Sequence, residues 1–132
     1  MEKTVRIPSK IESLRVVEKL VDEMAATCML NNVVYGNILV AALEGVNNAI
    51  VHGNRLDSST EVIFSIRCDE HEVHLNIKDQ GKGFDYTHVP DPTAPENIEN
   101  ISGRGVFLMQ KLSDKLIFSD NGSSVEIIFK IS

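Results

Sequence analysis

Three polar side chains stand at four-residue steps on one predicted helix of this 132-residue chain. Glu44, Asn48 and His52 therefore line up along one side of that helix. The apolar stripe of the same helix consists of Ile38, Leu39, Ala42, Leu43, Val46, Ala49 and Ile50. A carboxylate, an amide and an imidazole beside such a stripe either face a pocket for a polar ligand or form a solvated polar edge. The row alone leaves both interpretations open.

A carboxylate and two glycine pairs follow further along the chain. Asp79 shares a predicted strand face with Val73, Leu75 and Ile77, so its side chain points inward and needs a partner. Gly81 and Gly83 follow it in the run DQGKGFD, where glycines permit a close approach of a ligand. A second glycine pair, in the run SGRGV at residues 102–106, precedes a predicted helix and offers backbone N–H groups to an anion. Each pair alone is also compatible with a simple turn.

Composition and charge restrict the classes of function. A chain of 132 residues with 42% hydrophobic content suits one globular domain, which we assign to residues 1–132. The net charge of −6 and the lack of Lys/Arg clusters longer than a pair argue against nucleic acid and against anionic membrane as partners. The N-terminal run MEKTVRIPSK has no apolar segment, and no membrane-spanning run is expected. We therefore expect a cytoplasmic protein.

The cysteines and histidines lack the spacing of a metal site. Cys28 and Cys68 lie far apart in sequence and are expected to be reduced and structural. His71 and His74 flank a turn and a strand, where solvent exposure is expected. A zinc site is not expected.

The order of predicted elements indicates the fold. We expect strands at 4–7, 60–68, 73–79, 115–118 and 125–131, and helices at 10–29, 33–54 and 106–112. Between them, residues 80–104 form a long loop rich in glycine and proline, which predicts a lid at about residues 84–103. This order predicts an α+β two-layer sandwich, with helices on one face of a mixed, mostly antiparallel sheet.

Taken together, the three motifs resemble a known set of nucleotide-binding boxes. E-x-x-x-N-A-x-x-H-G from Glu44, D-x-G-x-G from Asp79 and G-x-G from Gly103 follow the order found in the superfamily of gyrase, heat-shock chaperone, histidine kinase and mismatch-repair ATPases. Within this histidine kinase-like ATPase superfamily, with its Bergerat-type fold, the chain is similar to the small bacterial anti-sigma-factor serine/threonine kinases. The lid and the first helix contribute little to the resemblance.

The resemblance implies roles for residues of the first two boxes. Asn48 matches the residue whose side-chain oxygen binds the Mg²⁺ that bridges the ATP phosphates. Glu44 matches the general base, one turn before this metal ligand. Asp79 matches the residue that accepts a hydrogen bond from the adenine amine, and Gly81 and Gly83 would shape the adenine pocket.

The remaining residues implied by the resemblance lie near the end of the chain. Ser123 matches a position that supports adenine through a water molecule. Gly103, Arg104 and Gly105 would fold around the phosphates, with Arg104 contacting the γ-phosphate. His52 also matches a family position, where we expect it to orient the helix end and not to act in catalysis.

Three hypotheses of function follow from the resemblance. The leading hypothesis is an ATP-binding anti-sigma factor in the cytoplasm that takes part in transcription regulation and phosphorylates a serine or threonine of a small anti-sigma antagonist protein. The second is a switch that holds its partner according to ATP or ADP state, without turnover. The third is a detached ATPase domain of a sensor histidine kinase. The resemblance also implies a homodimer and binding to a sigma factor.

Overall fold

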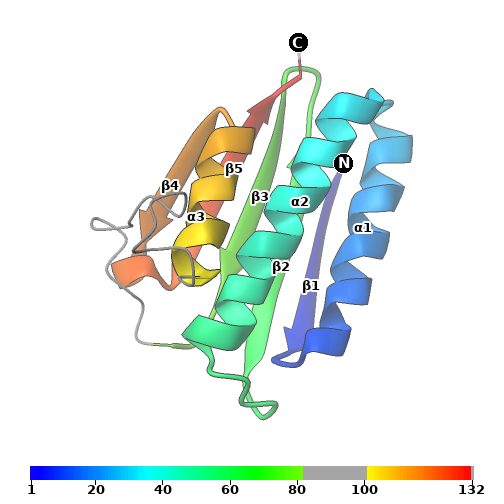
Figure 1. Cartoon of the computed structure of the whole chain (residues 1–132). Helices are drawn as coiled ribbons and strands as arrows, with labels where there is room; N and C mark the ends of the chain where they lie inside the picture. The colour runs from blue at the N-terminus through cyan, green and yellow to red at the C-terminus, as the bar shows by residue number, and fades with distance from the viewer. Residues whose placement is uncertain (82–100, 132) are drawn as a thin grey trace.

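Helices cover one face of a β-sheet in the computed structural model of the chain (Figure 1). The structure describes residues 1–81 and 101–131, without the side chains of residues 101–104. The elements are β1 (Glu2–Pro8), η1 (Ile11–Ser13), α1 (Leu14–Thr27), α2 (Asn32–Asn48), η2 (Ala49–Gly53), β2 (Glu61–Cys68), β3 (Glu72–Lys78), α3 (Ile101–Leu112), β4 (Lys115–Ser119), η5 (Asp120–Gly122) and β5 (Ser124–Lys130). Gly83 and residues 84–100 of the predicted lid lie outside the described residues.

The sheet has five strands in the order β1-β2-β3-β5-β4. Each of its pairings is antiparallel, from Glu2 opposite Arg67 at one edge to Lys115 opposite Ile128 at the other. The predicted two-layer α+β fold is confirmed, and the sheet is antiparallel throughout instead of mixed. Successive strand residues alternate between the two faces of the sheet. In β3, for example, Val73, Leu75 and Ile77 are buried against the helices, whereas Glu72, His74 and Asn76 face outward.

The core lies between the sheet and the helices. Fully buried strand residues are Val62, Phe64, Ile66, Val73, Leu75 and Ile127. Helix α2 lies between α1 and α3 over the middle of the sheet (Figure 1) and buries Ile38, Ala41, Ala42, Val46 and, from η2, Ile50. This central position brings the polar row of α2 next to both the sheet and α3.

Helix α2 corrects the expectation about membrane-spanning segments. Together with η2 it forms a 22-residue helical segment, Asn32–Gly53, whose most apolar window has a mean hydropathy of 1.3. Length and composition alone would allow such a segment to cross a membrane. The expectation that the chain has no run of this length and hydropathy was therefore wrong. The core helix of a soluble protein meets the same criterion, and here the apolar residues pack on the sheet, so the finding is weak support for a membrane span.

The start of α3 also differs from the prediction. The helix includes residues from Ile101 onward, five positions before the expected start at Val106, so Gly103 and Gly105 lie within it instead of in a preceding loop. Gly105 is buried, and a Cβ built on it would lie 3.2 Å from Glu44 Oε2. This glycine therefore permits close packing of α3 on α2.

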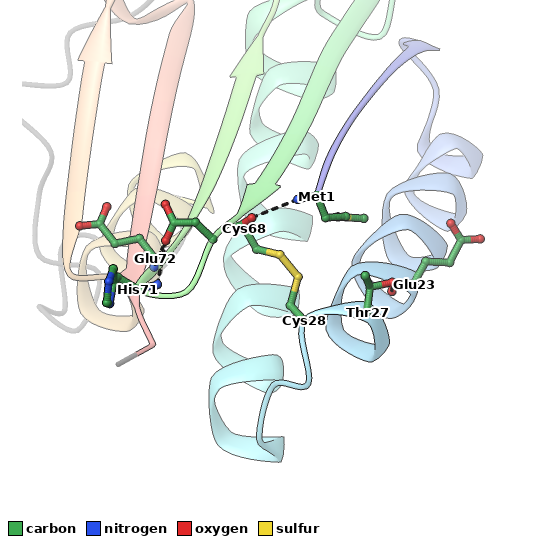
Figure 2. The surroundings of a disulfide bond; sticks show 8 residues. Met1, Glu23, Thr27, Cys28, Cys68, His71 and Glu72 are labelled. Atoms are coloured by element: carbon green, nitrogen blue, oxygen red, sulfur yellow. Dashed lines mark hydrogen bonds between the residues drawn. A yellow bond between two sulfur atoms is a disulfide. The ribbon is translucent and has the colours of Figure 1, made fainter.

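The two cysteines form a disulfide, so the prediction that they are reduced was wrong (Figure 2). Cys28 follows the last turn of α1 and Cys68 ends β2, and the packing of α1 beside the sheet brings their Cα atoms to 6.8 Å. Sequence separation gave no sign of this proximity. In the chain-entropy treatment, a cross-link across a separation of 40 residues stabilises the fold by roughly 4 kcal/mol.

Candidate functional site

A small cavity lies where α2 meets the ends of β3 and β5. Its walls are Gly45, Asn48, Ala49, Ile77, Asp79, Met109, Phe118, Gly122, Ser123 and Val125. Three residues predicted for the site, Asn48, Asp79 and Ser123, therefore share one cavity although they are separated by up to 75 positions in the sequence. The helix, the end of β3 and the turn before β5 supply one polar group each.

The cavity volume is about 10 Å³. That is about the minimum space for one water molecule, so a larger ligand enters only after wall side chains move. Two of the walls, Met109 of α3 and Phe118 of β4, were not identified from the sequence, because apolar residues in amphipathic elements are typical of any core. Methionine is well suited to a wall that must adapt, since its side chain is flexible.

Asp79 is the buried acid of this cavity, with 8% of its surface exposed. Its backbone N–H donates to the Ser123 carbonyl at 2.9 Å, and its Oδ1 accepts a hydrogen bond from the Gly81 N–H at 2.8 Å. Burial raises the pKa of the Asp79 carboxyl, and the Gly81 hydrogen bond opposes that shift. The second carboxylate oxygen, Oδ2, lies beside Gly53.

Two glycines enclose the carboxylate of Asp79. A Cβ on Gly53 would collide with the carboxylate group, and a Cβ on Gly81 would collide with the Gly53 carbonyl. A side chain at Gly53 would displace the Asp79 carboxylate, and a side chain at Gly81 would require a shift of the backbone. Gly81 was a predicted site residue, whereas Gly53 was only the last residue of the first motif and was given no role at the site.

Asn54 anchors the segment that carries Asp79, and sequence reasoning missed it. Its Nδ2 donates to Ser9 Oγ at 2.9 Å and to the Glu61 carbonyl at 3.0 Å. Its Oδ1 accepts a hydrogen bond from the Gln80 N–H at 2.7 Å. This buried amide thus ties the residue after Asp79 to β2 and to the β1–α1 corner. An asparagine after a glycine at a helix end is typical of a simple cap, so no sequence signal distinguished it.

The other predicted residues lie around the cavity, not in its wall. Glu44 is half-buried on α2, one turn before Asn48, and its carboxylate faces Gly105 of α3. His52 is exposed and lines a separate cavity of about 280 Å³ together with Gly53, Arg55 and Gly81 among others. The side chain of Arg104 is outside the described part of the structure, although its backbone belongs to α3.

Comparison with known proteins identifies the family. Residues 7–129 match the family model of the histidine kinase-like ATPase domain. The chain belongs to this family. Its arrangement of a helix-borne polar row against an antiparallel sheet is thus the histidine kinase-like ATPase fold that the sequence motifs predicted.

Curated relatives of this histidine kinase-like ATPase domain carry two kinds of name. An anti-sigma F factor of Anoxybacillus flavithermus is 37% identical over 91 residues, which are 64% of this chain and 62% of that protein. An anti-sigma F factor of Clostridium perfringens is 32% identical over 98 residues, 71% of this chain and 69% of the relative. The serine-protein kinase RsbW of Oceanobacillus iheyensis is 25% identical over 116 residues, 83% of this chain and 73% of the relative. The match thus spans less than two thirds of the Anoxybacillus protein.

The raised pKa of Asp79 generates a prediction about stability. Because the native state holds this proton more tightly than the unfolded state, the charged form destabilises the fold. The cost is absent below the ordinary pKa of 3.8 and complete above the raised native pKa. Asp79→Asn should therefore be more stable than the wild type at pH 7 in urea unfolding, and the difference should shrink as the pH falls toward 3.8.

Asp57→Asn is the control of opposite sign. Hydrogen bonds from Ser59 lower the pKa of the exposed Asp57 carboxyl, so its stabilising contribution is present above the ordinary pKa and is lost as the pH falls through the native one. Asp57→Asn should accordingly be no more stable than the wild type at pH 7. An Asp79→Asn protein that is less stable than the wild type at pH 7 would contradict the burial cost of Asp79.

Proposed function

We propose that this chain is an ATP-binding anti-sigma regulatory protein and a serine/threonine kinase. The observation that supports this most is the shared cavity of Asn48, Asp79 and Ser123, with Glu44 one turn away on α2. The names of the relatives, anti-sigma F factor and serine-protein kinase, are consistent with both parts of the proposal. The phosphoacceptor is proposed to be a small antagonist protein, and the sequestered partner a sigma factor.

Adenine recognition is assigned to Asp79. Its carboxylate, at the wall of the cavity, suits the exocyclic amine of adenine, which is a hydrogen-bond donor. Guanine has a carbonyl oxygen at the corresponding position, and two acceptors facing each other repel. Ser123, with its hydroxyl at the same cavity, would bind the base through a water molecule. The glycines at 53 and 81 support this role because they leave room for the carboxylate, which the Gly81 N–H holds at Oδ1.

Phosphate and Mg²⁺ binding is assigned to α2 and α3. The amide oxygen of Asn48 is the type of ligand that Mg²⁺ prefers, and bound Mg²⁺ would neutralise phosphate charge. Such neutralisation matters in a chain with a net charge of −6. Gly103 and Arg104 lie toward the N-terminal end of α3, which carries the positive end of the helix dipole and suits an anion. Gly105, which packs on Glu44, contributes by allowing this approach.

Glu44 is assigned as the general base. A carboxylate one turn before Asn48 can take the proton of a serine or threonine hydroxyl as its oxygen bonds to the γ-phosphorus and ADP leaves. A binding switch without turnover needs no base at this position. The proposal includes a cytoplasmic location and the absence of direct contacts with nucleic acid or membrane.

Two substitutions on α2 separate binding from chemistry. Glu44→Gln keeps the shape but cannot take a proton, so ATP affinity should persist while phosphoryl transfer falls by about 10²–10⁴-fold. Asn48→Ala removes a metal ligand, so Mg²⁺-ATP binding itself should weaken. The measurements are calorimetry with Mg²⁺-ATP and transfer from γ-labelled ATP to a small protein in lysate of the source organism, followed by phosphoamino-acid analysis.

Matched controls exist for both variants. Glu18→Gln changes an exposed glutamate of α1. Asn47→Ala changes an asparagine that does not line the cavity, although it is next to Asn48, which does. Both should keep affinity and transfer. Labelled serine or threonine supports the kinase, and binding without any transfer would favour the nucleotide-dependent switch. Label on histidine would favour a detached histidine kinase domain, and wild-type transfer by Glu44→Gln would remove the base.

The expected homodimer stays a prediction, supported by the uncovered face of the sheet. No helix in the described ranges lies on that face (Figure 1). Ile63, Ile117 and Ile128 lie on it, opposite Lys78, Glu126 and Lys115 of the neighbouring strands. Ile117 is 48% exposed, which is high for a large apolar residue of a strand. Sedimentation should show a dimer that Ile117→Lys weakens, whereas a wild-type monomer at high micromolar concentration would rule the dimer out.

A further inference from the structure

The Cys28–Cys68 disulfide lies at the opposite end of the sheet from Asp79. Cys68 pairs with Val73 at the start of β3, whereas Asp79 follows the other end of that strand. We propose that this disulfide is a thiol-exchange site, at which a low-molecular-weight thiol forms a mixed disulfide with Cys28 and Cys68 is the leaving thiol. The site is independent of the proposed nucleotide chemistry.

Accessibility distinguishes the two sulfurs. Cys28 is half-buried and lines a cavity of about 240 Å³, together with Met29, Leu30, Asn31, Val34, Glu70 and Ile131. Cys68 is only 7% exposed and belongs to the core. An incoming thiolate can therefore reach Cys28 through the cavity, while the sheet and helices shield Cys68.

The backbone of Cys68 is held by more hydrogen bonds than that of Cys28. The Cys68 N–H donates to the Met1 carbonyl at 2.9 Å, and the Cys68 carbonyl accepts from the Met1 amino group at 3.3 Å (Figure 2). The Cys28 N–H donates to the Met24 carbonyl at 2.8 Å, but Cys28 directly precedes the α1–α2 connection, where Met29 has a φ of 55° and is 89% exposed. Cys28 can thus carry an added group outward, whereas Cys68 remains in the strand.

The exchange step is balanced as follows. The thiolate forms a new S–S bond to Cys28 Sγ, and the electron pair of the old bond leaves with Cys68 Sγ, which takes a proton from water. A second external thiol then attacks the external sulfur of the mixed disulfide and releases Cys28. Two thiols supply two electrons in total and become one external disulfide. The product of the two steps is the protein with two free thiols. Under oxidising conditions the same steps run in reverse and form the Cys28–Cys68 disulfide again.

Charges around the cavity select among thiols. Glu70 lines it, whereas the carboxylates of Glu23 and Glu72 point away from the disulfide (Figure 2). Lys3 pairs with Glu23 at 3.0 Å and Glu72 Oε2 contacts His74 Nε2 at 2.7 Å, so Glu70 is the acidic residue that lines the cavity. A negative wall disfavours anionic thiols and favours cationic ones. In a cytoplasmic protein, as proposed here, disulfides are typically exchanged in this way instead of persisting.

The test treats two single-cysteine variants with a disulfide reagent and the wild type with a thiol. Cys68→Ser leaves Cys28 alone and Cys28→Ser leaves Cys68 alone, and each is treated with cystamine, the cationic disulfide, under native conditions. Intact mass spectrometry should show modification of Cys28 at least about tenfold faster than that of Cys68. Circular dichroism checks that both variants are folded. The wild type is treated with cysteamine, and the first adduct is trapped by acid and mapped by digestion. We expect this adduct on Cys28.

Glu70→Gln tests the charge selection. Cystamine should react faster than oxidised glutathione with the Cys68→Ser protein, and adding Glu70→Gln should narrow that ratio. Glu12→Gln, on η1 at the other end of α1, should leave the ratio unchanged. A first adduct on Cys68, equal rates for the two cysteines, or two free thiols in wild type after equilibration with oxidised glutathione would overturn the proposal.

Discussion

The buried carboxylate of Asp79 is the constraint on which the site depends. A charged group in this position costs stability, as its raised pKa indicates, and the fold keeps it in place with the Gly81 N–H and with two glycines that leave room for it. A protein without a use for this carboxylate would gain stability from an apolar residue. The cost is understandable if the carboxylate serves recognition of a ligand.

Several distant segments are held together around this carboxylate. Asn54 links the residue after Asp79 to β2 and to Ser9, so the end of β3 cannot shift without disturbing the N-terminal corner. On the other side, Gly45 and Gly105 allow α2 to approach the sheet and α3 closely. The polar row of α2 therefore meets the strand ends at short range, although the small cavity shows that ligand entry requires its walls to move.

Regular patterns were predictable from the sequence, whereas tertiary proximity was not. Alternating residues such as Val73, Leu75 and Ile77 fixed the inward direction of Asp79, and four-residue spacing placed Glu44 one turn from Asn48. The pairing of Cys28 with Cys68, the burial of Asn54 and the early start of α3 depend on packing between segments far apart in sequence. Glycine was the ambiguous residue, because Gly105 suggested a loop but serves helix packing.

Calorimetry of the wild-type chain with Mg²⁺-ATP and Mg²⁺-GTP tests the role of Asp79 most directly. We expect ATP to bind at least about tenfold more tightly than GTP, since a carboxylate facing the guanine carbonyl leaves buried acceptors unpaired. Equal affinity for the two nucleotides, or no binding of either, would contradict the assignment of this cavity as an adenine site.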